Sequence, residues 1–240
     1  TRIGHYEVSA LIGEGGMGQV WQATDTQLNR QVALKILPDA FAADPDRLAR
    51  FTREAQILAS LNHPHICTLY DIGSQDEIDF LVMEYLEGET LEERLLRGPL
   101  PLSDAVQQTL VILSTLEAVH RRGLIHRDLK PANLLFTTHG LKLLDFGLAR
   151  AIDPELSATT AKMTQAGTVL GTPQYLAPES LHGQPVDARA DLFAVGTVLY
   201  EMLTGQPPFK ADSLAALVHA IAHDRPAALT GSTAIAAVDR

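Results

Sequence analysis

The spacing of the apolar residues changes near Gly88, and this change constrains the fold more than any other feature of the sequence. Before it, short apolar segments bounded by turn-forming residues predict β-strands at 6–12, 20–24, 32–36, 66–70 and 80–84. One helix is expected among them, over 44–61. After it, apolar residues recur at helical spacing and predict helices over 103–123, 187–203 and 213–223, with a short hairpin over 134–143. A strand-rich first part and a helix-rich second part predict an α+β fold with two lobes and a cleft between them.

The charge of the chain excludes one class of partner. A formal net charge of -10 would repel the phosphates of a nucleic acid rather than neutralise them. Cys67 is the single cysteine, so no intrachain disulfide forms, and a reducing compartment fits. No stretch is long and apolar enough to span a bilayer, so we expect no membrane contact by this segment itself. Because the chain begins with Thr1, we treat it as an excised piece of a longer protein. We expect this piece to lie in the cytoplasm, whether or not the parent protein is anchored in a membrane.

Four glycines lie between the first two predicted strands, and three of them are candidates for phosphate binding. Gly13, Gly15 and Gly18 would let backbone N–H groups approach phosphates without a Cβ in the way. By itself this pattern is weak, because a tight glycine-rich hairpin explains it about as well. It is not a Walker loop, since no lysine followed by serine or threonine comes after the last glycine.

A lysine lies inside a predicted strand, flanked by apolar residues, in Val32-Ala33-Leu34-Lys35. A buried ammonium group is costly unless it is paired. Glu54 is a plausible partner, because it shares a helix face with Phe51 and Leu58 and its carboxylate needs a cation there. Two alternatives remain open: a strand-edge lysine whose ammonium group reaches water, and an intrahelical pair between Glu54 and a neighbouring arginine.

The stretch His126-Arg-Asp-Leu-Lys-Pro-Ala-Asn133 carries the strongest chemical signal. It places an acid, a cation and an amide within six residues, just past a predicted helix end. Asp128 could accept a proton from a hydroxyl group, Lys130 could neutralise a transferring phosphoryl group, and Asn133 could offer an oxygen to Mg²⁺. Asp145-Phe146-Gly147 follows a predicted strand and offers a second Mg²⁺ ligand beside a flexible glycine.

Taken in order, these motifs and Ala177-Pro178-Glu179 resemble the eukaryotic-type protein kinase family over nearly the whole chain. Each motif could arise by chance, but six in the correct order and rough spacing could not reasonably do so. The phrases beginning at Arg53, Asn62 and Asp187 are most similar to bacterial Ser/Thr protein kinases. The resemblance implies a bilobal kinase fold, whose parts are a small β-rich N-lobe over about 1–85, a hinge over about 84–89, and a larger helical C-lobe over about 90–240 that lacks its last helices.

The resemblance also implies an activity, which is transfer of the γ-phosphoryl group of ATP, with Mg²⁺ or alternatively Mn²⁺, to Ser or Thr hydroxyl groups of protein substrates. Asp128 would act as the catalytic base, with Lys130 beside the phosphoryl group. Lys35, paired to Glu54, would hold the α- and β-phosphates. The metal ligands that it implies are Asn133 and Asp145, and the ATP-binding residues are Ile12, Gly13, Gly15, Gly18, Val20, Ala33, Lys35, Met83, Glu84, Leu86 and Leu135.

Two groups of apolar and main-chain positions complete this implied site. Met83 matches the gatekeeper position, and the main chain of Glu84 and Leu86 would hydrogen-bond to the adenine. The side chains that match the family's stacked internal spine are Leu58, Leu69, His126 and Phe146. Asp191 resembles the buried aspartate that anchors the backbone of the catalytic loop, although a plain carboxylate at a helix N-terminus is the alternative.

Regulation is expected at the loop that follows Phe146. Arg127 resembles the cation that binds a phosphate on this loop, with Thr168 as the best-placed acceptor and Thr164 as the second. Phosphorylation there would add about two negative charges and order the loop. Thr172 could bond both Asp128 and Lys130, which favours Ser/Thr over tyrosine specificity. Autophosphorylation in trans would use a homodimer.

Rival functions are weaker. A pseudokinase, which would act as a binding or scaffold module, would usually lack Lys35, Asp128 or Asp145, and all are present. His219 and His223 could ligate zinc from one helix face, yet no third ligand is evident. The family pairs the residue at Glu179 with a late arginine, and no clear candidate precedes the end of the chain.

Overall fold

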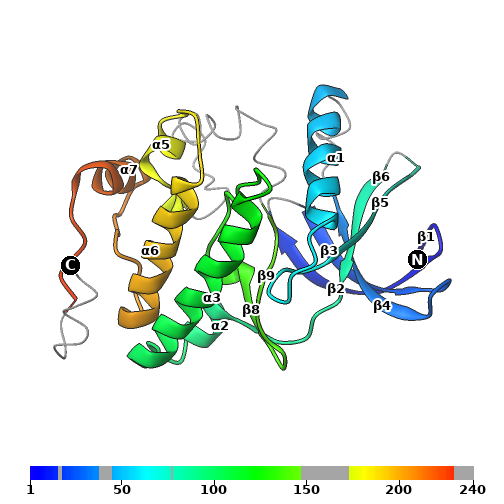
Figure 1. Ribbon diagram of the computed structural model, residues 1–240, viewed down its shortest axis with the longest axis horizontal. Coiled ribbons are helices and arrows are strands. Elements are labelled where there is room, and N and C mark those ends of the chain that lie inside the picture. Colours follow the sequence, from blue (N-terminus) through cyan, green and yellow to red (C-terminus); the bar gives the residue numbers. More distant parts are fainter. Residues whose placement is uncertain (16–17, 38–44, 77, 147–172, 230–240) are drawn as a thin grey trace.

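The computed structural model describes residues 1–15, 18–37, 45–76, 78–146 and 173–229. A curled sheet lies at one end of the molecule, and most of the helices lie at the other (Figure 1). The expected α+β bilobal fold is therefore confirmed. None of the helices within these ranges is long and apolar enough to cross a membrane.

The first part of the chain forms an antiparallel sheet with the strand order β1-β2-β3-β4-β6-β5. Its strands are β1 (Arg2–Ile3), β2 (Tyr6–Gly15), β3 (Gly18–Asp25), β4 (Arg30–Ile36), β5 (Leu69–Gln75) and β6 (Ile78–Glu84). Side chains alternate between the two faces of each strand. In β4, Val32 and Leu34 are fully buried in the apolar core of the sheet. Lys35 therefore projects from the opposite face, together with Ala33.

Helix α1 (Pro45–Ala59) lies beside this sheet and packs against β5 (Figure 1). Phe51, Leu58 and Leu69 are buried in one cluster with Phe146 and with Val119 from the helical part. This cluster is the apolar joint between the two ends of the molecule.

The second part of the chain is helical and encloses a small antiparallel sheet, β7-β8-β9. Its strands are β7 (Glu89–Thr90), β8 (Leu134–Thr137) and β9 (Gly140–Leu143), and its α-helices are α2 (Leu91–Leu95), α3 (Leu102–His120), α5 (Pro178–Leu181), α6 (Arg189–Thr204) and α7 (Leu214–His223). Helices α3 and α6 lie side by side (Figure 1) and share a core that includes Ile112, Leu116, Val198 and Met202. Single turns of 3-10 helix cover Pro131–Asn133 and Pro173–Tyr175.

Two differences from the expected elements have local causes. The strand expected at 66–70 begins only at Leu69, the first residue of β5, and Ile66 makes an isolated parallel bridge to Leu143 instead. Helix α2 was not expected. It is short, but Thr90 and Glu93 form a capping box at its N-terminus, and this pattern is readable in the sequence.

Candidate active site

Lys35 and Asp145 meet although 110 positions separate them in the chain. The Lys35 ammonium nitrogen lies 2.7 Å from Asp145 Oδ1, and the two side chains are 8% and 30% exposed. Strand β4 positions the lysine, and the turn after β9 positions the aspartate. The sequence motifs from the two ends of the molecule therefore converge on one place.

Two residues of the catalytic motifs have a left-handed backbone. Arg127 has a φ of 63° and Asp145 a φ of 43°. Side chains other than glycine rarely adopt this region, and such residues persist only where the surroundings hold them. The structure thus places backbone strain at Arg127, in the 126–133 loop, and at Asp145.

Asp191 holds the strained loop. Its carboxylate is 1% exposed and accepts hydrogen bonds from the amide N–H groups of His126 at 2.8 Å and Arg127 at 2.9 Å. The expected anchoring of the loop by this aspartate is confirmed. His120 Nε2, from the end of α3, is a third partner at 2.7 Å. Nothing in the sequence distinguished His120, because its contact with Asp191 exists only after α3 and α6 have packed.

The His126 ring is buried and fixed at both nitrogens. Nε2 lies 3.1 Å from the carbonyl oxygen of Leu144 and Nδ1 lies 3.3 Å from the amide nitrogen of Asp128. The amide must donate, so Nδ1 accepts and Nε2 carries the proton. Burial lowers the pKa of His126, and the ring is therefore neutral at pH 7. Its centroid lies 4.6 Å from that of Phe146, which aligns two members of the expected internal spine.

Asp128, Lys130 and Asn133 form one cluster. Asp128 is 5% exposed, and its Oδ2 lies 3.0 Å from Lys130 Nζ. Asn133 Nδ2 donates to the same Oδ2 at 2.9 Å and to the main-chain oxygen of Asp128 at 2.7 Å. Because the amide nitrogen is used in this way, the amide oxygen of Asn133 is the atom that remains for a metal ion.

The predicted ion pair between Lys35 and Glu54 is wrong for this structure. Lys35 pairs with Asp145, and Glu54 Oε1 lies 3.5 Å from a guanidinium nitrogen of Arg127. The turn at Asp145 brings its carboxylate to the head of Lys35, while Arg127 reaches α1 from the catalytic loop. Each carboxylate is thereby neutralised by one cation. Glu54 does pair with an arginine, but across the lobes rather than within its helix.

The expected phosphate-binding glycines lie in the β2–β3 hairpin. Gly13 is opposite Val20, and Gly15 is opposite Gly18. Gly18 has a φ of 107°, a conformation that suits glycine. Ile12, on the same hairpin, is 46% exposed.

The expected adenine-binding residues lie on strands of both sheets. Ala33 is opposite Met83 in the large sheet, and Leu135 lies on β8 with 8% exposure. Between these strands the chain packs closely, since a Cβ on Gly88 would lie 2.1 Å from the carbonyl oxygen of Phe136. No Cβ fits there, so glycine at position 88 sets how closely this connection approaches β8.

Two features fit a bound nucleotide and metal ion. Within the described residues, the main-chain N–H and C=O groups of Leu86 hydrogen-bond to no protein group, so both can serve a purine base. Asp145 and Asn133 offer hard oxygen ligands, which suit Mg²⁺. The same part of the chain holds no cluster of three or more His, Cys, Asp or Glu side chains that could hold a metal. A metal ion bound here would therefore need further oxygen ligands, from water or from a phosphate.

The remaining expected positions are the three regulatory threonines and the histidine pair of α7. Thr164, Thr168 and Thr172 lie outside the described residues. His219 and His223 have ring centroids 4.7 Å apart, but within the described residues they belong to no cluster that could hold a metal.

Known protein kinases are similar to this chain over most of its length. The sequence profile described as the protein kinase domain matches residues 6–236. A probable serine/threonine-protein kinase of Streptomyces coelicolor is 47% identical over 232 residues, which are 94% of this chain and 34% of that protein. The probable serine/threonine-protein kinase PknB of Bifidobacterium longum is 44% identical, covering 90% of this chain and 32% of its own length. For PknB of Mycobacterium leprae the identity is 44%, and the shares are 87% and 34%.

The match is partial for each of these relatives, since this chain spans about a third of their length. The chain belongs to the protein kinase family.

Proposed function

We propose that this domain transfers the γ-phosphoryl group of Mg-ATP to Ser or Thr hydroxyl groups of protein substrates. The observation that carries the proposal is the 2.7 Å contact between Lys35 and Asp145. It joins a lysine suited to phosphates with a carboxylate suited to a metal ion, although 110 positions separate them in the chain. Phosphoryl transfer needs mainly alignment and neutralisation of spread charge, which such a cluster supplies.

The proposed roles follow the chemistry of each side chain. Asp128 orients the attacking hydroxyl group and accepts its proton, and Lys130, 3.0 Å from Asp128, balances negative charge beside it. Asn133 and Asp145 would hold Mg²⁺. When bound, the metal ion would neutralise charge on the phosphates. Leu86 would bind the adenine through its main chain, and Lys35 would contact the phosphates.

We also propose control by phosphorylation. A phosphate on Thr168 or Thr164 would compete with Glu54 for the guanidinium group of Arg127, because both are anions and the existing contact is a single one of 3.5 Å. If the double variant Thr168→Ala and Thr164→Ala keeps the full activity of ATP-treated protein, this part of the proposal is wrong. A second copy of the chain, acting in trans in the cytoplasm, is the proposed kinase for these sites.

The decisive experiment measures transfer of labelled phosphate from ATP to a generic basic protein. Asp128→Asn should lower the rate by about 10²–10⁴-fold, the usual contribution of a general base. Asp187→Asn, which changes an exposed carboxylate on the same lobe, should keep the wild-type rate. Equal incorporation by wild type and Asp128→Asn would instead favour the pseudokinase alternative. Mass spectrometry of the protein with and without ATP would locate any autophosphorylated residue.

A further inference from the structure

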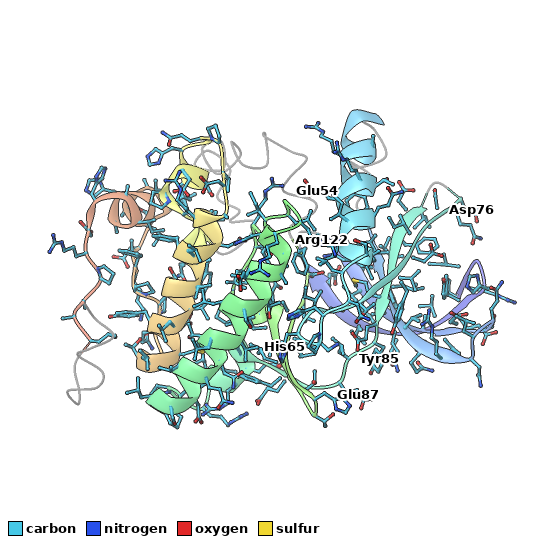
Figure 2. The ribbon with its side chains drawn as sticks, viewed as in Figure 1. Glu54, His65, Asp76, Tyr85, Glu87 and Arg122 are labelled. Carbon is cyan, nitrogen blue, oxygen red and sulfur yellow. The ribbon has the colours of Figure 1, made fainter. Side chains whose placement is uncertain are left out.

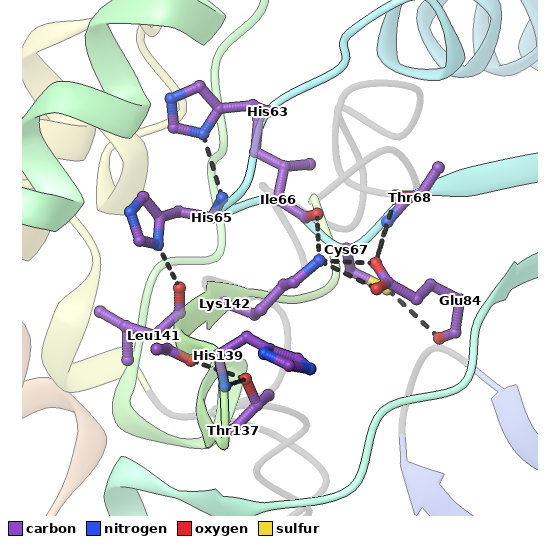
Figure 3. Close-up of polar contacts among 11 residues, drawn as sticks. His63, His65, Ile66, Cys67, Thr68, Glu84, Thr137, His139, Leu141 and Lys142 are labelled. Atoms are coloured by element: carbon purple, nitrogen blue, oxygen red, sulfur yellow. Dashed lines mark hydrogen bonds and ion pairs between the residues drawn. The ribbon is translucent and has the colours of Figure 1, made fainter.

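A partly buried ion pair joins two side chains that the proposed chemistry does not use. Lys142 on β9 places its ammonium nitrogen 2.7 Å and 3.0 Å from the two carboxylate oxygens of Glu84, the last residue of β6. The Lys142 side chain is 12% exposed and that of Glu84 is 25% exposed. Figure 3 shows the two side chains pointing toward one another. The pair joins the end of the large sheet to the small sheet of the helical lobe.

A third segment, residues 65–68, completes the contact. The carbonyl oxygen of Ile66 accepts a hydrogen bond from Lys142 at 3.4 Å. The amide and hydroxyl groups of Thr68 both donate to Glu84 Oε2 at 3.2 Å. In Figure 3 the ammonium group lies between the Ile66 carbonyl and the Glu84 carboxylate. One lysine thus contacts a main-chain group and a side chain from two other segments.

Main-chain hydrogen bonds connect the same three segments. Leu143, next to Lys142 on β9, donates to the carbonyl of His65 at 2.8 Å and accepts from the amide of Cys67 at 2.9 Å. Glu84 donates its amide to the carbonyl of Thr68 at 2.8 Å. The segment 65–68 is therefore bonded to the end of β6 on one side and to β9 on the other.

The ion pair is better suited to fixing geometry than to raising stability. Removing two charges from water is expensive, and a buried pair can contribute little net free energy of folding. Burial by itself would raise the pKa of Glu84, but the hydrogen bonds from Lys142 and Thr68 outweigh it and lower that pKa. The carboxylate therefore stays charged and keeps its directional bonds.

Both ends of the pair lead directly to proposed nucleotide contacts. The chain runs from Glu84 to Leu86, whose main-chain groups suit the adenine, and from Lys142 along β9 to Asp145. We propose that Lys142 is a positioning residue for nucleotide binding, because it fixes the distance between the adenine-binding connection and the metal-binding aspartate. This inference rests on the proposed function.

The kinetic test uses Lys142→Met, which keeps the length of the side chain and removes its charge. We expect the KM for ATP to rise about tenfold, a loss of about 1.4 kcal/mol of binding. The kcat and the KM for the protein substrate should change less than about twofold. Arg97→Met, which breaks the exposed pair between Arg97 and Glu89, is the matched control and should leave all three values unchanged. Lys142→Arg should recover most of the ATP affinity.

A second measurement separates positioning from general stability, and it needs no catalysis. Hydrogen exchange of the nucleotide-free Lys142→Met protein should be faster in residues 65–68 and 84–86, while α6 exchanges at the wild-type rate. Uniformly faster exchange, or an unchanged KM for ATP, would overturn the proposal. If Lys142→Met does not fold, Thr68→Val removes one hydrogen bond to Glu84 and should raise the KM by about two- to threefold. Absence of phosphotransfer by the wild-type protein would refute the proposed function. The hydrogen-exchange result would still test whether Lys142 holds residues 65–68 and 84–86 in place.

Discussion

The catalytic loop (126–133) and helix α1 both form part of the candidate site, but a buried carboxylate holds the loop and a partly exposed ion pair holds the helix. The Asp191 carboxylate, which is 1% exposed, fixes the loop by accepting two hydrogen bonds from its amides at 2.8 Å and 2.9 Å, and it accepts a third from His120 of α3 at 2.7 Å. Glu54 ties α1 to Arg127 through one contact of 3.5 Å, and both of these side chains are 26% exposed. Figure 2 shows Glu54 on the inner side of α1, toward the helical part.

This difference has a functional meaning. A buried carboxylate with three donors has no alternative partner, so the loop that carries Asp128 is preorganised. A single, partly exposed ion pair is weak and can be exchanged for another. We infer that the loop that carries Asp128 is rigid, while the ion pair that α1 makes with this loop can be exchanged for another. The following predictions test this contrast, in order of decreasing effect.

The largest effect is expected from Asp191→Ala. It leaves the amides of His126 and Arg127 and the ring of His120 without their buried acceptor, which should lower the free energy of unfolding by about 3–5 kcal/mol. Urea denaturation measures this loss. Asp212→Ala, at an exposed carboxylate of the same lobe that makes no side-chain hydrogen bond or ion pair within the described residues, is the control and should keep the wild-type midpoint.

If Asp191→Ala does not fold, Asp191→Asn tests the same contact, because it keeps one acceptor oxygen. It should fold with a smaller loss of stability and a clear loss of phosphotransfer. A variant as stable and active as wild type would show that the loop does not depend on Asp191.

The next effect concerns His126→Phe, and it depends on pH. The folded ring has a lowered pKa, so its contribution is present above the unfolded pKa of about 6.5 and is lost as pH falls below it. At pH 7.5 the variant should lose about 1–3 kcal/mol, because the amide of Asp128 and the carbonyl of Leu144 lose their partners. The gap from wild type should narrow between pH 7.5 and 5.5.

Denaturation curves at several pH values measure this gap. His139→Phe changes an exposed histidine and should follow the wild-type pH dependence. A gap for His126→Phe that is constant over this range would contradict a neutral, buried ring.

A smaller effect is expected from Glu54→Gln. Because the pair with Arg127 is partly exposed, the free energy of unfolding should fall by less than about 1 kcal/mol, and by less still at high salt. Glu117→Gln, which breaks the exposed pair with Arg121, is the matched control. A loss as large as that of Asp191→Ala would remove the contrast between the two sides of the site.

The smallest effect is expected from thiol reagents at Cys67, which lies in the segment between α1 and β5. Burial, with the nearby carboxylates of Glu84 and Asp145, raises the pKa of this thiol to about 12. It stays protonated at neutral pH, so the folded protein should react with iodoacetamide far more slowly than the urea-unfolded chain. Because the folded pKa is raised, this thiol's contribution to stability is present below about pH 9 and is lost as pH rises toward 12. Rapid labelling of the folded protein at pH 7.5 would show that the α1 side opens further than we infer.

Much of this protein could be predicted from local patterns. The strand and helix periods gave the two-part α+β fold, and the motif at 126–133 identified the acid, the cation and the amide that the structure places together. The strand around Lys35 was predictable because alternation alone puts Val32 and Leu34 on the core face. Periods and motifs act over a few residues, and the sequence displays them directly.

Which charges pair with each other could not be predicted in the same way. The sequence predicted an ion pair between Lys35 and Glu54. In the structure the carboxylate that contacts Lys35 belongs to Asp145, and Glu54 pairs with Arg127 instead. His120 at Asp191 and Lys142 at Glu84 carried no sequence signal, because their partners lie 71 and 58 positions away.

The amino-acid order by itself determined the lobes, the strand faces and the residues that carry the chemistry, since these depend on short-range spacing. Only the tertiary structure decided which cation neutralises which carboxylate. Coulomb energy depends on the distance between two charges and on their burial, and both quantities are set when remote segments pack against one another.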